Sequence, residues 1–474
     1  MKTGKMRTIV SILLLCAYNI HAQEYSTGCL LEDEFGEQLP QNAPLLTRDY
    51  AILPASCSLE KYCPTPGNQI PYETCVGWST TYAARTIAEA AAYGWTDQEK
   101  IDREAFSPLS VYVKIKYRDD FDCQKSTSIP RALSVLKNEG AAKYKDFDAT
   151  CATSMPPEVQ NNTGLYKIDD YCQLFGKQAS REDKIRKTKK ALSEDKPVII
   201  GMDCYRSFNN ATDSWDGVTD ALKGGHAVCV IGYDNNINGG SFHVMNSWGT
   251  RWGYGGFTWI TYDDYCKHVH EAYELFVRKK VAPSQPAPVS VPVPEKTISL
   301  AGEIRFELSM GAEMPGTLCS SGDMPYYQLA GHYTSGTRYR IYIANNEPAY
   351  VYVIGSDLSN DPNMLFPPSV RISPALLYKS NNIAIPGENL YMETDNTTGE
   401  DYICVLYSYN TLPINEIIGK IKNAPGSFPD KVKTALAIYM VPAKEIEYGQ
   451  NTMRFSVKNT DKPVLPVIVE MKHK

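Results

Sequence analysis

Two hydrophobic patterns divide the chain. In the first, apolar positions recur at helical spacing, in stretches at 76–94, 128–140 and 181–195. These are followed by short, continuous apolar runs at 197–204, 226–234, 242–249 and 256–262. Runs of this length indicate strands, whereas the earlier stretches indicate helices. Helices first and strands later predict an α+β fold in which a helical lobe faces an antiparallel sheet lobe.

The second half of the chain carries only short β-rich runs. They lie at 303–310, 337–344, 349–355, 401–408, 434–441, 453–459 and 464–471. Such runs, separated by turn residues, predict a mostly-β sandwich. Residues 281–296 precede them, with five prolines in sixteen positions, which favours an extended linker. We therefore expect one domain at 63–280 and another at 297–474.

The N-terminus has the pattern of a secretory signal. Residues 1–22 combine a basic start, the apolar run "IVSILLLCAYNI" and a small residue at Ala22. Export to the periplasm, the cell surface or the medium is the expectation, with no transmembrane segment in the mature chain. Lipid attachment at Cys16 is an alternative, although Leu15 before it is not a small residue. Residues 23–62 are polar and turn-rich and form an N-terminal extension.

Composition narrows the class of protein. The chain has 474 residues, of which 43% are hydrophobic and 22% charged, which is typical of soluble globular domains. The formal charge of −6 argues against a nucleic-acid partner. In an exported protein the thirteen cysteines tend to be oxidised in pairs. Cys57 with Cys63, or Cys123 with Cys151, are candidate pairs.

One set of residues is suited to nucleophilic catalysis. Cys75 precedes the helical stretch 76–94, and a helix N-terminus favours the thiolate form. His226 begins an apolar run after Gly224 and Gly225, where substrate backbone could approach closely. Asn246 could fix the tautomer of this imidazole, and Trp248 could shield their hydrogen bond from water.

These residues resemble the papain family of cysteine peptidases. The resemblance covers about residues 45–275 and is most specific in "NSWGTRWGYGGF", which follows a "GGHAV" run. It implies a Cys75, His226 and Asn246 triad that forms a thioester acyl-enzyme. It also implies that Gln69 donates to the oxyanion. A protein or peptide substrate follows, with no metal and no other cofactor.

The sequence departs from the family pattern beside the nucleophile. Tyr72 stands where many members have a cysteine, and Val76 where they have an aromatic residue, which moves to Trp78. We associate this variation with bacterial members. Only about forty residues separate the leader from the first peptidase residues, so we expect no large autoinhibitory domain in this N-terminal segment.

The C-terminal half resembles a bacterial domain of unknown function of the DUF4384 type, over about residues 330–410. Its role stays open between a spacer and a module that binds a surface, a glycan or a protein.

Other readings of single residues are less favourable. His243 lies three positions from Asn246 on the same predicted strand, so it faces away. Cys266, His268 and His270 lack a fourth ligand for a metal. Two rival functions use the same scaffold: a non-catalytic binding protein with a blocked thiol, and an acyl transferase that uses an amine in place of water.

Overall fold

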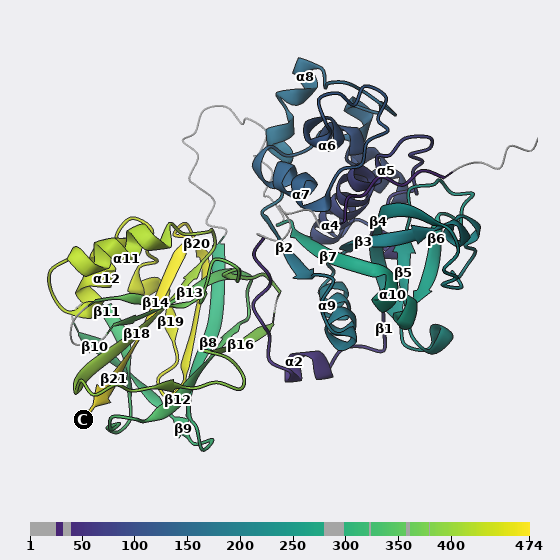
Figure 1. Ribbon diagram of the computed structural model, residues 1–474. Coiled ribbons are helices and arrows are strands. Elements are labelled where there is room, and N and C mark those ends of the chain that lie inside the picture. The colour runs from purple at the N-terminus through teal and green to yellow at the C-terminus, as the bar shows by residue number, and fades with distance from the viewer. Residues whose placement is uncertain (1–24, 32–38, 279–297, 322–323, 357–360, 379) are drawn as a thin grey trace, which may run out of the picture.

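The computed structural model describes residues 25–31, 39–278, 298–321, 324–356, 361–378 and 380–474. The predicted signal segment 1–22 and the proline-rich segment 281–296 lie outside these ranges. Figure 1 shows the two halves of the chain side by side, with residues 39–51 running between them. In the described residues, no helix is both long and apolar enough to cross a membrane.

Helices form one lobe of the first half. They are α3 Cys75–Gly77, α4 Thr86–Tyr93, α5 Gln98–Glu104, α6 Pro108–Ile115, α7 Ile129–Asn138 and α8 Pro157–Gln160. A π-helical segment, Trp78–Arg85, joins α3 to α4 into one continuous buried helix. Gly94 ends it in the left-handed conformation, with φ 68°, as expected of a glycine cap. The helices predicted at 76–94 and 128–140 are confirmed.

An antiparallel sheet forms the other lobe. Its strand order is β2-β7-β3-β4-β5-β6, and β1 also pairs with β4. The strands are β1 Ser56–Ser58, β2 Asp170–Phe175, β3 Val198–Tyr205, β4 Leu222–Asp234, β5 Ser241–Met245, β6 Phe257–Thr261 and β7 Val269–Phe276. Two helices, α9 Arg181–Ser193 and α10 Tyr262–His268, pack against it. The predicted helix at 181–195 and the four predicted strands are confirmed, whereas β2 and β7 were not predicted.

The second half is a sandwich of two sheets. The first has the order β10-β11-β21-β18-β13-β14, with β15 paired to β13. The second has the order β16-β12-β8-β20-β19, with β9 and β17 at its edges. The strands are β8 Ile298–Leu308, β9 Glu313–Met314, β10 Gly316–Ser321, β11 Met324–Leu329, β12 Arg338–Asn345, β13 Ala349–Ser356, β14 Asn363–Phe366, β15 Ala375–Leu376, β16 Asn381–Ile385, β17 Met392–Glu393, β18 Gly399–Ser408, β19 Glu447–Tyr448, β20 Met453–Thr460 and β21 Val464–His473.

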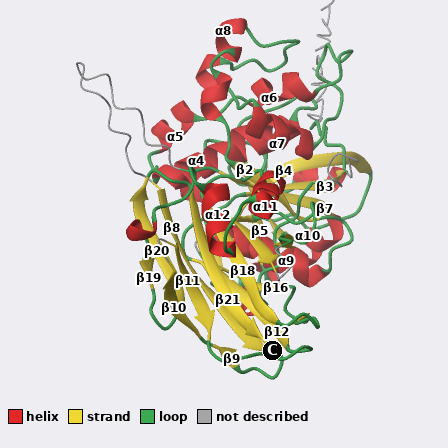
Figure 2. Ribbon diagram, turned by 90° about the vertical axis from the view of Figure 1, so that its left-hand side faces the viewer, coloured by secondary structure: helices red, strands yellow, loops and turns green. Residues whose placement is uncertain are grey.

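The predicted mostly-β sandwich is confirmed, with one parallel pair, β11 with β21, among otherwise antiparallel described pairs. Side chains such as Ile341, Val405 and Val467 fill the space between the sheets. Two helices, α11 Ile414–Asn423 and α12 Phe428–Leu436, cover the outer face of the first sheet (Figure 2).

The strand predicted at 434–441 is wrong. Its first residues, through Leu436, belong to α12, which Ser427 begins with a capping box that includes Asp430. Val432 and Leu436 of this helix are buried against the sheet. The β-propensity of the apolar run is overridden by a helix start signal seven residues earlier.

The cysteines form fewer bonds than we expected. Cys123 and Cys151 are joined by a disulfide, as one of the two candidate pairs predicted. Cys57 and Cys63 are free thiols, which corrects the other. Cys57 lies on β1 and its thiol contacts the carbonyl of Leu192 on α9, whereas the Cys63 thiol contacts the carbonyl of Leu59.

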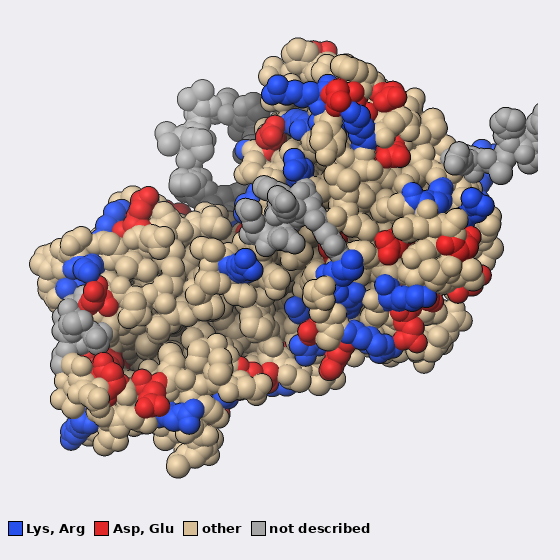
Figure 3. All heavy atoms as spheres, viewed as in Figure 1, with Lys and Arg blue, Asp and Glu red and all other residues tan. Residues whose placement is uncertain are grey.

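Charge is evenly mixed on the visible surface. Basic and acidic side chains are interspersed over the peptidase-like half in Figure 3, without a large patch of one sign.

Candidate active site

Helix and sheet lobes meet at Cys75. The helix α3 begins at this residue, and its thiol accepts a hydrogen bond from the backbone N–H of Ala227, the residue after His226. Both Cys75 and His226 are 0% exposed. Burial raises the pKa of the Cys75 thiol, and the Ala227 N–H opposes the shift only in part. The thiol is therefore protonated in this closed state.

The imidazole of His226 is oriented by an amide. Its Nε2 lies 2.8 Å from Oδ1 of Asn246, an oxygen that also accepts from the backbone N–H of Ser247 at 2.8 Å. Because an amide oxygen only accepts, Nε2 carries the proton in the neutral ring. Nδ1 has no hydrogen-bond partner among the described residues. This leaves a base with a free lone pair in the buried site.

Aromatic packing keeps this histidine neutral. The Trp248 ring stacks on the His226 ring with centroids 4.8 Å apart and an interplanar angle of 24°. Burial lowers the pKa of His226 to about 4, the hydrogen bond to Asn246 opposes this shift, and the charge of Lys223 adds to it. At neutral pH both Cys75 and His226 are uncharged.

Gln69 is held at both ends of its amide. Its Oε1 accepts from the hydroxyl of Ser247 at 2.6 Å. Its Nε2 donates to the backbone carbonyls of Thr27 at 3.0 Å and Tyr72 at 2.9 Å. The proposed oxyanion donor is thus turned toward a peptide carbonyl in the closed state.

The carbonyl of Thr27 belongs to a cover segment, which we define as residues 25–31. The backbone N–H of Cys29 donates to the carbonyl of Gly225 at 3.0 Å, and Leu30 and Gly28 pair with the two backbone groups of Thr127. The carbonyl of Ser26 accepts from the Trp248 indole at 2.8 Å. Because Gly225 adjoins His226, Trp248 stacks on it and Cys29 lies close enough to interact with Cys75, the cover segment closes the site.

Glycine at position 225 makes this approach possible. A Cβ there would lie 2.2 Å from the carbonyl oxygen of Cys29. No L side chain fits at that distance, so the glycine before His226 is required for backbone to pass. The close approach that the paired glycines predicted is seen with the chain's own backbone.

The structure brings together Gln69, Cys75, His226, Asn246 and Trp248. Sequence reasoning missed Ser247, which links the Gln69 side chain to the Asn246 amide. Its place between Asn246 and Trp248 was the available signal. The cover segment was missed entirely, because it lies about forty residues from Gln69 along the chain.

The set-aside histidines lie elsewhere. His243 stacks on Trp259 at 4.3 Å, and its Nδ1 is 3.9 Å from a carboxylate oxygen of Glu60. His270 contacts Asp203 at 3.0 Å, and His268 packs edge-on against Tyr205. No group of three metal-ligating side chains is found in the described ranges.

Comparison with known proteins identifies two regions. Residues 96–275 match the model of the papain family cysteine protease, and residues 332–411 match a domain of unknown function, DUF4384. The first region is therefore similar to the papain family and the second to this domain family. The papain-family match includes His226 and Asn246 but begins after Gln69 and Cys75.

Individual relatives are distant. An uncharacterized peptidase C1-like protein of Acanthamoeba polyphaga mimivirus is 26% identical over 183 residues, which cover 36% of this chain and 58% of that protein. Peptidase 1 of Dermatophagoides farinae is 24% identical over 187 residues, or 38% of this chain and 52% of that protein. The chain thus spans little more than half the length of these relatives.

Solved structures show the same level of similarity. Xylellain, a cysteine protease from Xylella fastidiosa, has a TM-score of 0.45 and 19% identity, covering 54% of this chain and 98% of xylellain. A recombinant stem bromelain precursor has a TM-score of 0.43 and 20% identity, covering 54% of this chain and 78% of that structure.

Proposed function

We propose that the chain is an exported cysteine peptidase that hydrolyses peptide bonds through a thioester on Cys75. The observation that carries the proposal is that the site already holds an extended peptide backbone. The cover segment places a carbonyl on the Gln69 amide and an N–H on the Gly225 carbonyl. A substrate chain can use the same partners, because they form hydrogen bonds only with backbone groups.

The residues are suited to acyl transfer. His226 Nδ1 takes the proton of the Cys75 thiol, and the thiolate attacks the substrate carbonyl to form a C–S bond. Gln69 Nε2 and the backbone N–H of Cys75 stabilise the oxyanion. The C–N bond then breaks as His226 returns the proton to the leaving amine. Water hydrolyses the thioester and releases the acid.

Asn246 and Trp248 act through His226. The amide oxygen holds the ring with Nδ1 free, and the indole excludes water from the bond between them. Lowered access of water strengthens this bond, since the local dielectric falls. Export is supported by the leader pattern at residues 1–22.

The closed state accounts for how the thiol is stored. With the cover segment in place, burial keeps Cys75 protonated and substrate cannot enter. Departure of the cover segment would hydrate the site, lower the thiol pKa and free Gln69 Nε2 for a substrate carbonyl.

A thiol-directed epoxide peptide and a peptide library test the proposal on the full chain. We expect a covalent adduct at Cys75, located by peptide mass spectrometry, and library cleavage that falls at least about a thousandfold in Cys75→Ala. Cys266→Ala is the matched control, because Cys266 is a free thiol outside the site. Equal turnover in Cys75→Ala and Cys266→Ala would contradict the mechanism. An adduct without turnover would favour the non-catalytic binding protein. Products joined to added amines would favour the acyl transferase.

A further inference from the structure

The N-terminal extension has a second, separate set of contacts. We define the strap as residues 39–50, which follow the cover segment after seven residues. Gln41 bridges the two halves: it pairs with Gln173 of β2 on one side and Ile372 of the C-terminal domain on the other. Its N–H donates to the carbonyl of Arg371, and its carbonyl accepts from the N–H of Ser373, both at 2.8 Å.

The strap then lies along the edge of the C-terminal domain. Leu45 pairs antiparallel with Ile383, so the strap extends the edge strand β16. The carboxylate of Asp49 accepts from both the backbone and the side-chain N–H of Asn382, each at 2.9 Å. Farther out, Glu388 accepts from the backbone N–H and the hydroxyl of Thr47.

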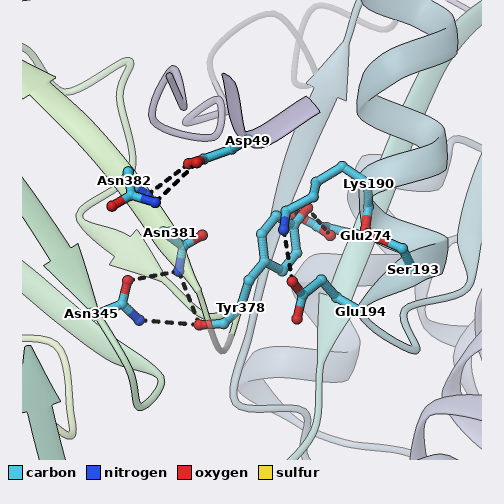
Figure 4. A network of polar contacts seen from close by, with 9 residues as sticks. All are labelled: Asp49, Lys190, Ser193, Glu194, Glu274, Asn345, Tyr378, Asn381 and Asn382. Carbon is cyan, nitrogen blue, oxygen red and sulfur yellow. Dashed lines mark hydrogen bonds and ion pairs between the residues drawn. The ribbon is translucent and has the colours of Figure 1, made fainter. Parts of the chain in front are cut away.

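A buried carboxylate fastens the junction. Glu274 of β7 is 0% exposed, and it accepts from the Tyr378 hydroxyl at 2.8 and 2.9 Å and from the Asn42 amide. Figure 4 shows the Tyr378 ring reaching across from the C-terminal domain to Glu274, with Asp49 and Asn382 paired beside it. The strap, the peptidase sheet and the C-terminal domain thus share one polar network.

We infer that the C-terminal domain is an inhibitory clamp, whose function is to hold the strap and thereby keep the cover segment in the active site. That the clamp is inhibitory rests on the proposed peptidase function. The clamp itself rests on the contacts above, which place the strap along strand β16 of the C-terminal domain.

The clamp adds to bonds that the peptidase sheet makes with the strap. Gln41 pairs with Gln173, and the Asn42 amide donates to Glu274, so these contacts remain if the C-terminal domain lets go. The contacts of Leu45, Thr47 and Asp49 are made to the C-terminal domain and would be lost. A strap held by its peptidase contacts alone opens more often, and the cover segment leaves the site more often with it.

The test compares full-length variants by the rate at which iodoacetamide labels Cys75, read by peptide mass spectrometry. The double variant Tyr378→Phe with Asn382→Ala removes the hydroxyl that donates to Glu274 and the amide that donates to Asp49, and it changes no residue of the peptidase region. Its matched control is Tyr391→Phe with Asn451→Ala, the same changes on the same domain away from the strap. We expect labelling about fivefold faster in the double variant, the effect of one net hydrogen bond lost, and an unchanged rate in the control.

Two further readouts separate the possible failures. Hydrogen exchange at Leu46, whose N–H donates to the Asn382 carbonyl, reports whether the strap is released. Glu388→Gln alters an exposed residue that cannot unfold the domain, and we expect a smaller rise in labelling.

A labelling rate equal to the control's, or a Leu46 amide as protected as in wild type, overturns the clamp. Faster labelling without peptide hydrolysis supports the clamp and contradicts the peptidase proposal.

Discussion

Two buried polar clusters lie on the same sheet and are closed by the same extension, but they are closed differently. Around His226, on β4, the cover segment contributes backbone carbonyls and N–H groups. Around Glu274, on β7, closure comes from the side chains of Asn42 and Tyr378. Backbone contacts can be replaced by any extended peptide, whereas side-chain contacts need one partner. The difference separates a site built for exchange from one built for attachment.

The largest expected effect on either cluster comes from removing His226. We expect His226→Ala to lower the rate of peptide hydrolysis by at least about a thousandfold, because no other group takes the thiol proton. The junction around Glu274 should be unaffected, so the exchange protection of the Leu46 amide should equal that of wild type. Activity within tenfold of wild type would show that another base serves Cys75.

Acid should act on the two clusters in opposite directions. The pKa of His226 is lowered to about 4, so between pH 4 and 6.5 the unfolded chain binds more protons and stability falls as pH falls. The full loss in the free energy of unfolding across this range is about 3 kcal/mol. Burial raises the pKa of Glu274 above its usual 4.5, so its contribution is present at low pH and is lost as pH rises.

Urea midpoints from pH 4 to 8 test this pair of slopes. His226→Ala should flatten the acid side of the wild-type profile, and Glu274→Gln should flatten the side above pH 4.5. A His226→Ala profile as steep as wild type between pH 4 and 6.5 would contradict the assignment.

Removing the Glu274 carboxylate tests how much the second cluster contributes to stability. Glu274→Ala leaves the buried Tyr378 hydroxyl and the half-buried Asn42 amide without this acceptor, at a cost of about 2 to 3 kcal/mol in the free energy of unfolding. Glu274→Gln keeps an acceptor for Tyr378 and should cost less than half as much. Urea unfolding checks the order, and equal losses in the two variants would mean that the network is not what stabilises the junction.

The smallest expected effect is on the cover segment itself. Trp248→Phe keeps an aromatic ring over His226 but removes the indole N–H that binds the Ser26 carbonyl. One neutral hydrogen bond is worth about 1 kcal/mol, so Cys75 should be labelled about fivefold faster. Trp259→Phe, a change of the same kind beside His243, serves as the control and should leave the rate unchanged.

Local patterns predicted most of the elements and the set of site residues. The helix from Cys75 to Gly94 could be predicted because alanines, helical spacing and a glycine cap agree. The run 434–441 could not, because a cap at Ser427 decides its start and packing on a sheet decides its conformation. Strands β2 and β7 were missed since β2 ends the sheet and gains its identity from β7, about a hundred residues later.

The contacts that matter most for regulation are the least local ones. Thr27 meets Gln69 across 42 positions, and Asp49 meets Asn382 across 333. Neither pair has a periodic or compositional signature, because the polar stretch 23–62 reads as an ordinary extension. Only the fold shows that its two parts lie on two different surfaces.

The order in which the chain is made gives the strap a further meaning. Its peptidase partners are complete once Phe276 has been synthesised, but Glu388, the last of its clamp residues, follows 112 residues later. At about 5 to 20 residues per second, this leaves roughly 6 to 20 seconds in which a folded catalytic half has no clamp. During translation the nascent chain therefore depends on the cover segment and on the strap's contacts with the peptidase sheet, and the clamp adds to them only when the last domain has folded.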